Sequence, residues 1–127
     1  MFRYKNEAAF SRAVVKLLGE HGWFVQRIES GTTGRGVPDI YAIEIKTKQA
    51  MWIELKRIHR EAGLKEVITW RPGQQAWLKN VVKYGQCAQT LCCFDNEIWI
   101  IPHATVYEKN VVSRAQASVI TSLQELL

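Results

Sequence analysis

Two carboxylates and a lysine stand at a spacing that suits metal-assisted chemistry. Asp39 follows a proline, and fourteen residues separate it from Glu54, with Lys56 two positions further on. On two strands joined by a turn with an even number of residues, Asp39 falls opposite Lys56 and diagonal to Glu54, so all three side chains project from one face. The two carboxylates would repel each other. A divalent cation such as Mg²⁺ relieves that repulsion, and Lys56 would then lie beside a metal-bound water.

The same Glu-x-Lys pattern occurs earlier, at Glu44 and Lys46. In a regular strand these two side chains point to the face opposite that of Asp39, so we do not assign them to the site. Glu54, by contrast, ends an apolar run, where an ionisable side chain is unusual without a partner. On spacing alone, a surface pair of charges with Asp39 nearby explains the pattern equally well, since Asp…Glu-x-Lys patterns are common by chance.

The elements that must position these residues follow from periodicity and from turn residues. We expect a helix over 6–20, a strand over 23–28, a loop over 30–38, and strands over 39–45 and 50–56 joined by a turn around Thr47-Lys48. An exposed connection over 58–70 then leads to a helix over 73–84 with Ala76, Trp77 and Val81 on one face. A hairpin of strands 88–94 and 97–101 and a last helix over 113–127 complete the order. This order predicts one α/β domain over 1–127, with a mixed β-sheet flanked by helices.

Composition and charge are typical of a globular protein of the cytoplasm. The 127 residues are 47% hydrophobic and 23% charged, with a net charge of +5 that favours polyanionic partners. No apolar run is long enough to cross a bilayer, and the polar N-terminus lacks the apolar segment of a signal peptide. The three cysteines, Cys87, Cys92 and Cys93, form no metal-binding pattern and are expected to pack as reduced, small hydrophobic residues.

Four stretches together form a more specific pattern. The first is Glu7, which lies in the expected first helix, and the second is a glycine-rich run that leads into Gly36-Val37-Pro38-Asp39. The third is the strand segment Trp52-Ile53-Glu54-Leu55-Lys56. The fourth opens the second helix and reads Arg71-Pro72-Gly73-Gln74-Gln75-Ala76-Trp77-Leu78. In this order they resemble the VRR-NUC family of the PD-(D/E)XK nuclease superfamily, in its small, stand-alone, phage-type form. The resemblance covers roughly residues 5–94.

The resemblance implies a restriction-endonuclease-like fold with the order α-β-β-β-α-β and a DNA-cleaving site. Asp39 and Glu54 would bind Mg²⁺, for which Mn²⁺ would substitute, together with the backbone carbonyl of Leu55. Lys56 would orient or deprotonate the attacking water. Glu7 would be a further acidic group at the metal, acting directly or through water. Gln74 would be a supporting polar residue.

The family also implies substrate, partner and compartment. Its members include endonucleases that cut branched DNA, often as homodimers, and the members found in bacteriophages would work in the cytoplasm of a bacterial host. The expected function is therefore metal-dependent hydrolysis of DNA phosphodiester bonds. A non-catalytic DNA-binding or assembly module of the same fold, or a nuclease acting on RNA, remains as an alternative.

Several assignments have alternatives on pattern alone. Glu7 shares a helical face with Phe10 and Val14, which suits a site residue. The alternative is that its carboxylate stays in water and interacts favourably with the helix dipole, as acidic residues in a first turn do. Gln74 near a helix start is commonly solvated, and Gln75 could take its place. The connection from residue 57 to residue 71 is longer than the usual link of the family.

Cationic side chains near the site are suited to bind DNA phosphates. The alternative is that they only belong to a polar connection exposed to solvent. The candidates are Arg35 in the glycine-rich loop and Arg57, Arg60, Lys65 and Arg71 beyond Lys56. Among the five tryptophans, only Trp70 is expected to be available for stacking, because core packing explains the others. Apolar residues at helical spacing near the C-terminus fit either a dimer contact or the chain's own core: Val119, Ile120, Leu123, Leu126 and Leu127.

Overall fold

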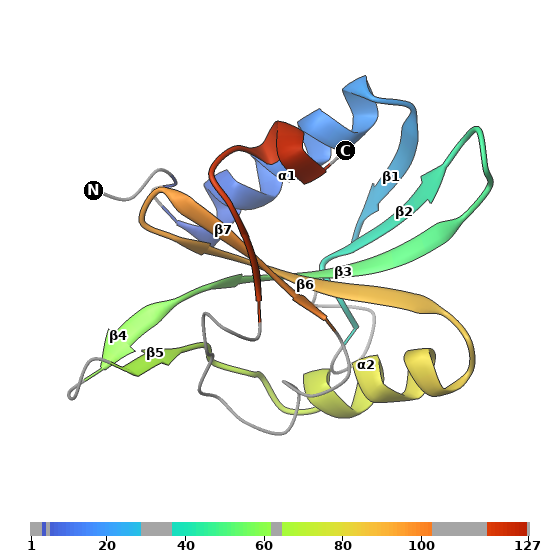
Figure 1. The fold of residues 1–127 in the computed structure, drawn as a ribbon. Coiled ribbons are helices and arrows are strands. Elements are labelled where there is room, and N and C mark those ends of the chain that lie inside the picture. The colour runs from blue at the N-terminus through green and yellow to red at the C-terminus, as the bar shows by residue number, and fades with distance from the viewer. Residues whose placement is uncertain (1–3, 5, 29–36, 62–64, 103–116, 127) are drawn as a thin grey trace.

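A six-stranded mixed sheet with a helix on each face forms the centre of the molecule (Figure 1). The structure, a computed structural model, describes residues 4, 6–28, 37–61, 65–102 and 117–126. The elements are α1 (Glu7–Glu20), β1 (Trp23–Arg27), β2 (Ile40–Glu44), β3 (Ala50–Arg57), β4 (His59–Glu61), β5 (Lys65–Val67), α2 (Gln74–Lys83), β6 (Cys87–Phe94), β7 (Glu97–Pro102), β8 (Ser118–Ile120) and the 3-10 helix η3 (Leu123–Leu126).

The strand order across the large sheet is β1-β2-β3-β6-β7-β8. Every neighbouring pair is antiparallel except β3 and β6, which run parallel and are connected through β4, β5 and α2. This arrangement confirms the predicted mixed α/β fold. Within the described residues, no helix combines the length and the apolar content needed to cross a bilayer.

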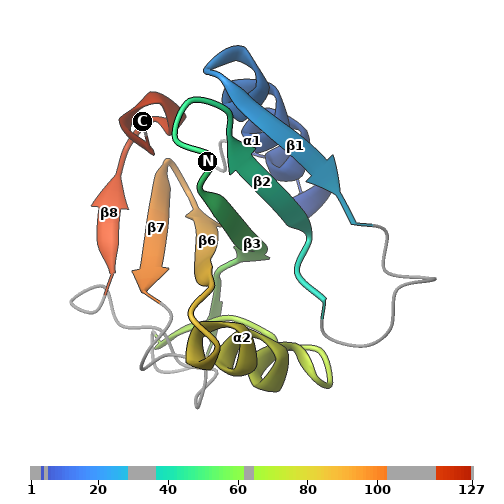
Figure 2. The ribbon, with the colours of Figure 1, turned by 90° about the vertical axis from the view of Figure 1, so that its right-hand side faces the viewer.

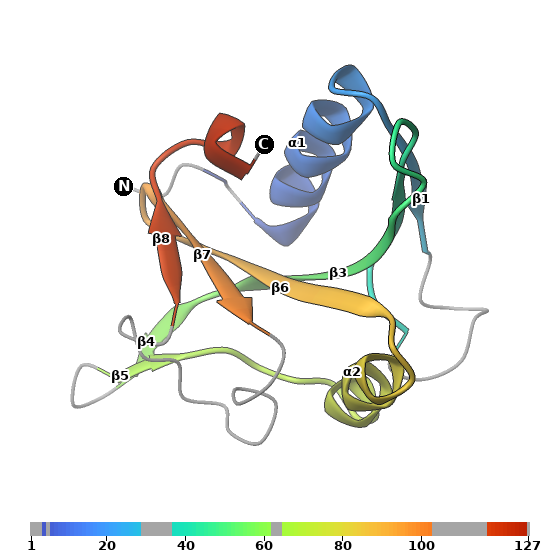
Figure 3. The same ribbon diagram turned by 45° about the vertical axis from the view of Figure 1, so that its right-hand side comes forward.

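The first helix covers one face of the sheet, as its apolar periodicity predicts. Asn6 caps it, because the side-chain oxygen accepts a hydrogen bond of 2.8 Å from the N–H of Ala9. Phe10 and Val14 are fully buried against sheet residues such as Ile40. Figure 3 shows α1 on one side of the sheet and α2 on the other. Residues at the start of α1 can therefore approach the sheet only from the face opposite α2.

The core-facing side of α2 differs from the prediction. Leu78 is the fully buried residue of this helix, whereas Trp77 and Val81 are half-buried and Ala76 is exposed. Gly73, with φ 88°, stands at the N-cap, so the helix starts at Gln74, which is itself buried. Gln74 and Leu78 are one turn apart and share a face. A polar residue thus occupies a core-facing position, which apolar periodicity alone cannot reveal.

The prediction that the connection over 58–70 is exposed is wrong, because parts of this segment are buried. Its described residues form the hairpin of β4 and β5, and Ile58 and Ile68, on either side of that hairpin, are each 1% exposed. Both pack into a second apolar cluster that includes Cys92 and Trp99. The hairpin is polar in sequence while the residues that flank it are apolar, so composition averaged over the segment hides the two buried anchors.

The predicted last helix over 113–127 is also wrong. Residues 117–126 form β8, which pairs with β7, and then η3, while 113–116 and 127 lie outside the described residues. Val119 and Ile120 are β-branched and favour a strand, and β7 offers unpaired backbone groups along its edge. Leu123 is 8% exposed and packs into the core beside α1. The apolar residues of this segment therefore cover the chain's own core.

Candidate active site

The register of β2 and β3 brings Asp39 beside Glu54. Ile40 pairs with Ile53, and one step further along the same register Asp39 stands opposite Glu54. The two carboxylates share a face, as predicted, but the expected partner of Asp39 was Lys56, so the register is shifted by two residues. A two-residue turn at Thr47-Lys48 of either favoured type would need a positive φ at Thr47, its first position. Of the two residues only Lys48 has a positive φ, 62°, and the chain turns over a longer segment.

Pairing between β2 and β3 stops at this point, and Pro38 explains why. Continuing the register would place Pro38 opposite Leu55, but proline has no N–H to donate to the Leu55 carbonyl. The N–H of Leu55 instead donates to Oδ2 of Asp39 at 2.8 Å. Because the N–H and C=O of one residue in a strand lie on the same edge, the Leu55 carbonyl lies beside the Asp39 carboxylate. Figure 2 shows β2 and β3 diverging toward the side on which α2 lies.

Glu7 reaches this gap from the other face of the sheet. Its Oε1 accepts a hydrogen bond of 3.2 Å from the N–H of Arg57, at the end of β3. Glu7 therefore contacts β3 as well as lying in the first turn of α1. A small pocket of about 120 Å³ opens here, lined by Glu7, Ala8, Ser11, Arg27, Asp39 and Leu55.

Gln74 links the two charged residues of β3. Its Oε1 accepts hydrogen bonds of 2.7 Å from Nζ of Lys56 and 2.7 Å from the N–H of Arg71, and its Nε2 donates to Oε2 of Glu54 at 3.0 Å. The ammonium can only donate and the carboxylate accepts, so the amide oxygen must face Lys56 and the amide nitrogen must face Glu54. The long connection before α2 does not displace Gln74, because the β4–β5 hairpin takes up the additional residues.

Burial makes the charges of this network unusual. Glu54 is 1% and Lys56 4% exposed. Burial raises the pKa of Glu54 from 4.5 to about 10, assisted by the hydrogen bond and negative charge of Asp39 and by the charge of Glu7, while Lys56 opposes the rise. Burial also lowers the pKa of Lys56, against the pull of Glu54, Glu7 and Asp39. The Lys56 Nζ lies over the Trp70 ring, 5.0 Å from the ring centroid.

These donors fit a hard cation that keeps most of its own water. Among the described residues, no group of three or more His, Cys, Asp or Glu side chains is arranged to hold a metal ion by itself. What the gap offers is the Asp39 and Glu54 carboxylates and the Leu55 carbonyl, with Glu7 bordering the same pocket. Mg²⁺ is commonly bound through one or two carboxylates, with water and substrate phosphate filling the other positions. Burial and the nearby charge of Asp39 raise the pKa of Glu54, and a bound cation would favour its charged form instead.

The structure brings together Glu7, Asp39, Glu54, Lys56 and Gln74, which come from α1, β3, α2 and the position just before β2. The candidate phosphate contacts are less uniform. Arg57 and Arg71 border the site through their backbone N–H groups. Arg35 lies outside the described residues, as do the side chains of Arg60 and Lys65.

Two polar residues that line the pocket were not predicted. Arg27 ends β1 and pairs with Ile40, next to Asp39, and Ser11 stands one helical turn after Glu7 and is 8% exposed. Helical spacing from Glu7 would have identified Ser11. Arg27 could have been found only from the pairing of β1 with β2, which the sequence does not state.

The sequence matches no protein-family model, and no curated protein matches it. We therefore infer function from the arrangement of the residues and from the resemblance of the motifs.

Proposed function

We propose that the chain is a Mg²⁺-dependent nuclease that hydrolyses DNA phosphodiester bonds, with a restriction-endonuclease-like fold of the VRR-NUC type. The observation that carries the proposal is the buried Glu54–Gln74–Lys56 network, which lies beside the Asp39 carboxylate at the gap between β2 and β3. A buried charged network is a weak source of stability, and strongly shifted pKa values gather at functional sites.

Each residue has a role that follows from its position. Asp39 and Glu54 would hold the ion together with the Leu55 carbonyl. When bound, Mg²⁺ lowers the pKa of water and offsets charge on the phosphate oxygens. Lys56 is held by Gln74 at 2.7 Å, and its lowered pKa suits it to exchange a proton with the attacking water. Arg27, on the pocket wall, would face the negative charge of a phosphate.

The preference for branched DNA, the homodimer and the cytoplasm of a bacterial host are part of the same proposal, and they follow from the motif resemblance. The positive net charge of the chain, +5, agrees with a polyanionic substrate.

Cleavage assays with matched variants test the proposal. Four-way junction, flap, plain duplex and RNA substrates would be incubated with Mg²⁺, Mn²⁺ or EDTA. Asp39→Asn keeps an oxygen that can accept from Leu55 but removes the charge, and Lys56→Met keeps the length of the side chain. The controls are Glu44→Gln and Lys46→Met, which alter the other Glu-x-Lys pattern, at the far end of β2.

We expect metal-dependent cleavage that each site variant lowers by about 100-fold or more and that each control leaves unchanged. Normal cleavage by Lys56→Met would remove Lys56 from the mechanism. Cleavage of RNA alone would change the substrate class. Binding without cleavage of any substrate would identify a non-catalytic module.

A further inference from the structure

Three aromatic side chains form a row beside the site. Tyr41 and Trp52 have ring centroids 4.5 Å apart and planes inclined by 46°, and Trp52 and Trp77 are 4.7 Å apart at 71°. Neither contact is a parallel stack, in which one ring would cover the face of the next. These three residues, which run from β2 across β3 to α2, form the aromatic row.

The aromatic row and the carboxylates lie on the same face of the sheet. Tyr41 follows Asp39 by two residues along β2, and Trp52 precedes Glu54 by two along β3. Side chains two apart share a face, at a separation of about 6.7 Å along a strand. The first two rings therefore stand one side-chain position from the groups that would hold the metal.

Packing explains only part of this row. Trp52 packs against the small cluster of Leu78 and Ala88, yet it, Tyr41 and Trp77 all stay half-buried. By comparison, Trp99, a core residue of the same sheet, is 1% exposed. Beyond the row, Phe24 on β1 is 55% exposed, and α2, the described helix on this face of the sheet, packs against β6 and does not extend over β1 (Figure 3). The described elements thus leave the row accessible from the β1 side.

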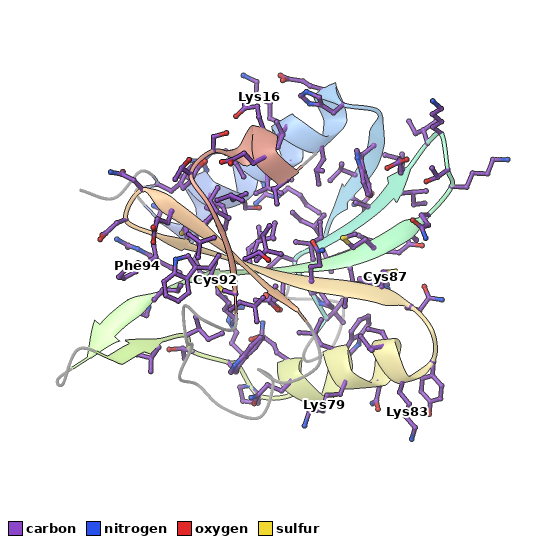
Figure 4. The ribbon with its side chains drawn as sticks, in the orientation of Figure 1. Lys16, Lys79, Lys83, Cys87, Cys92 and Phe94 are labelled. Carbon is purple, nitrogen blue, oxygen red and sulfur yellow. The ribbon has the colours of Figure 1, made fainter. Side chains whose placement is uncertain are left out.

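The helix at the other end of the row carries only positive charge. From Val67 to Phe94 the chain has no Asp or Glu, whereas Arg71, Lys79 and Lys83 are cationic. Figure 4 shows Lys79 and Lys83 on the side of α2 that faces away from the sheet. A strand that leaves the site over the outer side of α2 would meet these lysines, and α2 itself carries no acidic side chain.

We propose that the aromatic row stacks with unpaired bases of a nucleic-acid strand whose phosphate lies at the Asp39–Glu54 site. The identity of the ligand as a nucleic acid rests on the proposed function. Aromatic rings beside a cationic surface bind single strands with little sequence preference, because every base has a π face. Bases in an intact duplex are already stacked on each other, so the row favours substrates with unpaired or frayed bases next to the cut.

Abasic substitution tests the stacking directly. Binding of a single-stranded oligonucleotide would be measured in EDTA, by fluorescence anisotropy, against the same strand with consecutive abasic positions. Both strands carry identical phosphates, so only base contacts differ. We expect the wild-type chain to bind the abasic strand about tenfold more weakly or worse.

Variants of the row separate stacking from structure. Tyr41→Leu and Trp77→Leu remove a ring while keeping an apolar side chain, and each should bind both strands with more nearly equal affinity. Trp77→Phe should restore most of the discrimination. Tyr84→Leu is the matched control, because Tyr84 stands at the end of the same helix, is 73% exposed and lies outside the row. Thermal unfolding of each variant reports whether it remains folded.

The outcomes separate this inference from the proposed function. Cleavage activity with no discrimination against the abasic strand would overturn the stacking and leave the nuclease standing. Discrimination that depends on the row, in a chain that cuts nothing, would support the stacking and remove the nuclease. If Tyr41→Leu changed the sedimentation coefficient and left strand binding intact, the row would be a contact between two copies of the chain, and the inference would be wrong.

Discussion

The side-chain amide of Gln74 holds a carboxylate and an ammonium at fixed positions. Its oxygen binds Lys56 and its nitrogen binds Glu54, and the N–H of Arg71 occupies the remaining side of the oxygen. The contacts with Lys56 and Glu54 are shielded from water, since Gln74 is 5% exposed and both partners are buried. Gln74 is therefore a positioning residue: it would fix the ligand and the proton-exchanging lysine without touching the phosphate.

Gln74→Leu should lower cleavage by about 10- to 100-fold, the usual effect of removing a group that orients a metal ligand. The leucine cannot pair with either charged partner, and each would be left buried with one hydrogen bond fewer. The measurement is the cleavage rate at a series of Mg²⁺ concentrations, with folding checked by thermal unfolding.

Gln75→Leu is the matched control, because Gln75 is the adjacent residue and is only half-buried. It should cleave at nearly the wild-type rate. Equal losses in both variants would show that the helix start, rather than the Gln74 amide, sets the activity.

The alternation of side chains along strands is enough to predict that Asp39 and Glu54 share one face. It is not enough to fix their register, which depends on backbone angles in the turn that contains Lys48. It also could not reveal Arg27, whose place at the pocket follows from pairing between β1 and β2. Residues brought together within one hairpin are predictable, and those contributed by a neighbouring strand are not.

At the scale of elements, the β4–β5 hairpin connects the site to the core. It leaves β3 directly after Arg57 and returns to α2 through Ile68, which is anchored beside Cys92 and Trp99. Because Arg71 and Gln74 follow closely, the position of Ile68 influences where α2 begins.

Ile68→Ala should destabilise the fold by about 2–5 kcal/mol, as expected when a fully buried aliphatic side chain is truncated. Chemical denaturation measures this loss. The control is Thr69→Ala, at an exposed neighbouring position, which should change the free energy of unfolding by about 0.5 kcal/mol or less. A loss as small as the control's would mean that the hairpin is not anchored in the core.

The first helix, the strands β1, β2 and β3, the second helix and the β6–β7 hairpin were predicted closely, whereas β4, β5, β8 and η3 were not predicted. The first helix and the β6–β7 hairpin have many residues that repeat the same pattern, so single exceptions do not change the interpretation. The segment over 117–126 has apolar residues at spacings that suit a helix, but pairing with the edge of β7 outweighs that weak preference. Tertiary contacts decide such segments, and the sequence does not show them.

At the scale of the whole molecule, the site couples the protonation of one carboxylate to the stability of the fold. The pKa of Glu54 in the folded chain, about 10, lies above its ordinary value of 4.5. The stability that this group contributes is therefore fully present below pH 4.5 and is lost as the pH rises toward 10. Lys56, whose pKa is lowered by burial, acts in the opposite sense as the pH rises toward its ordinary value of 10.5.

The metal-free protein should accordingly melt at a lower temperature at pH 8 than at pH 5, and Glu54→Gln should reduce this difference. Mg²⁺ would replace the shared proton, so its stabilising effect should grow with pH. At a concentration of about 100 Kd it adds about 2.7 kcal/mol, or roughly 10 °C for a domain of this size.

Scanning calorimetry with Mg²⁺ and with EDTA measures both effects, and Asp39→Asn should abolish the shift caused by Mg²⁺. A shift that is the same at pH 5 and pH 8 would contradict the coupling between the proton and the metal.

The interruption of pairing at Pro38 bears on how such chains are recognised. Replacing this proline by a residue with an N–H would allow the Leu55 carbonyl to be bound by the neighbouring strand and the gap to close, while every acidic residue and the lysine stayed in place. A search that scores only Asp39, Glu54 and Lys56 would accept that chain as active. Whether a related chain keeps the activity therefore depends on the absence of a backbone N–H at position 38 as much as on the side chains of Asp39, Glu54 and Lys56.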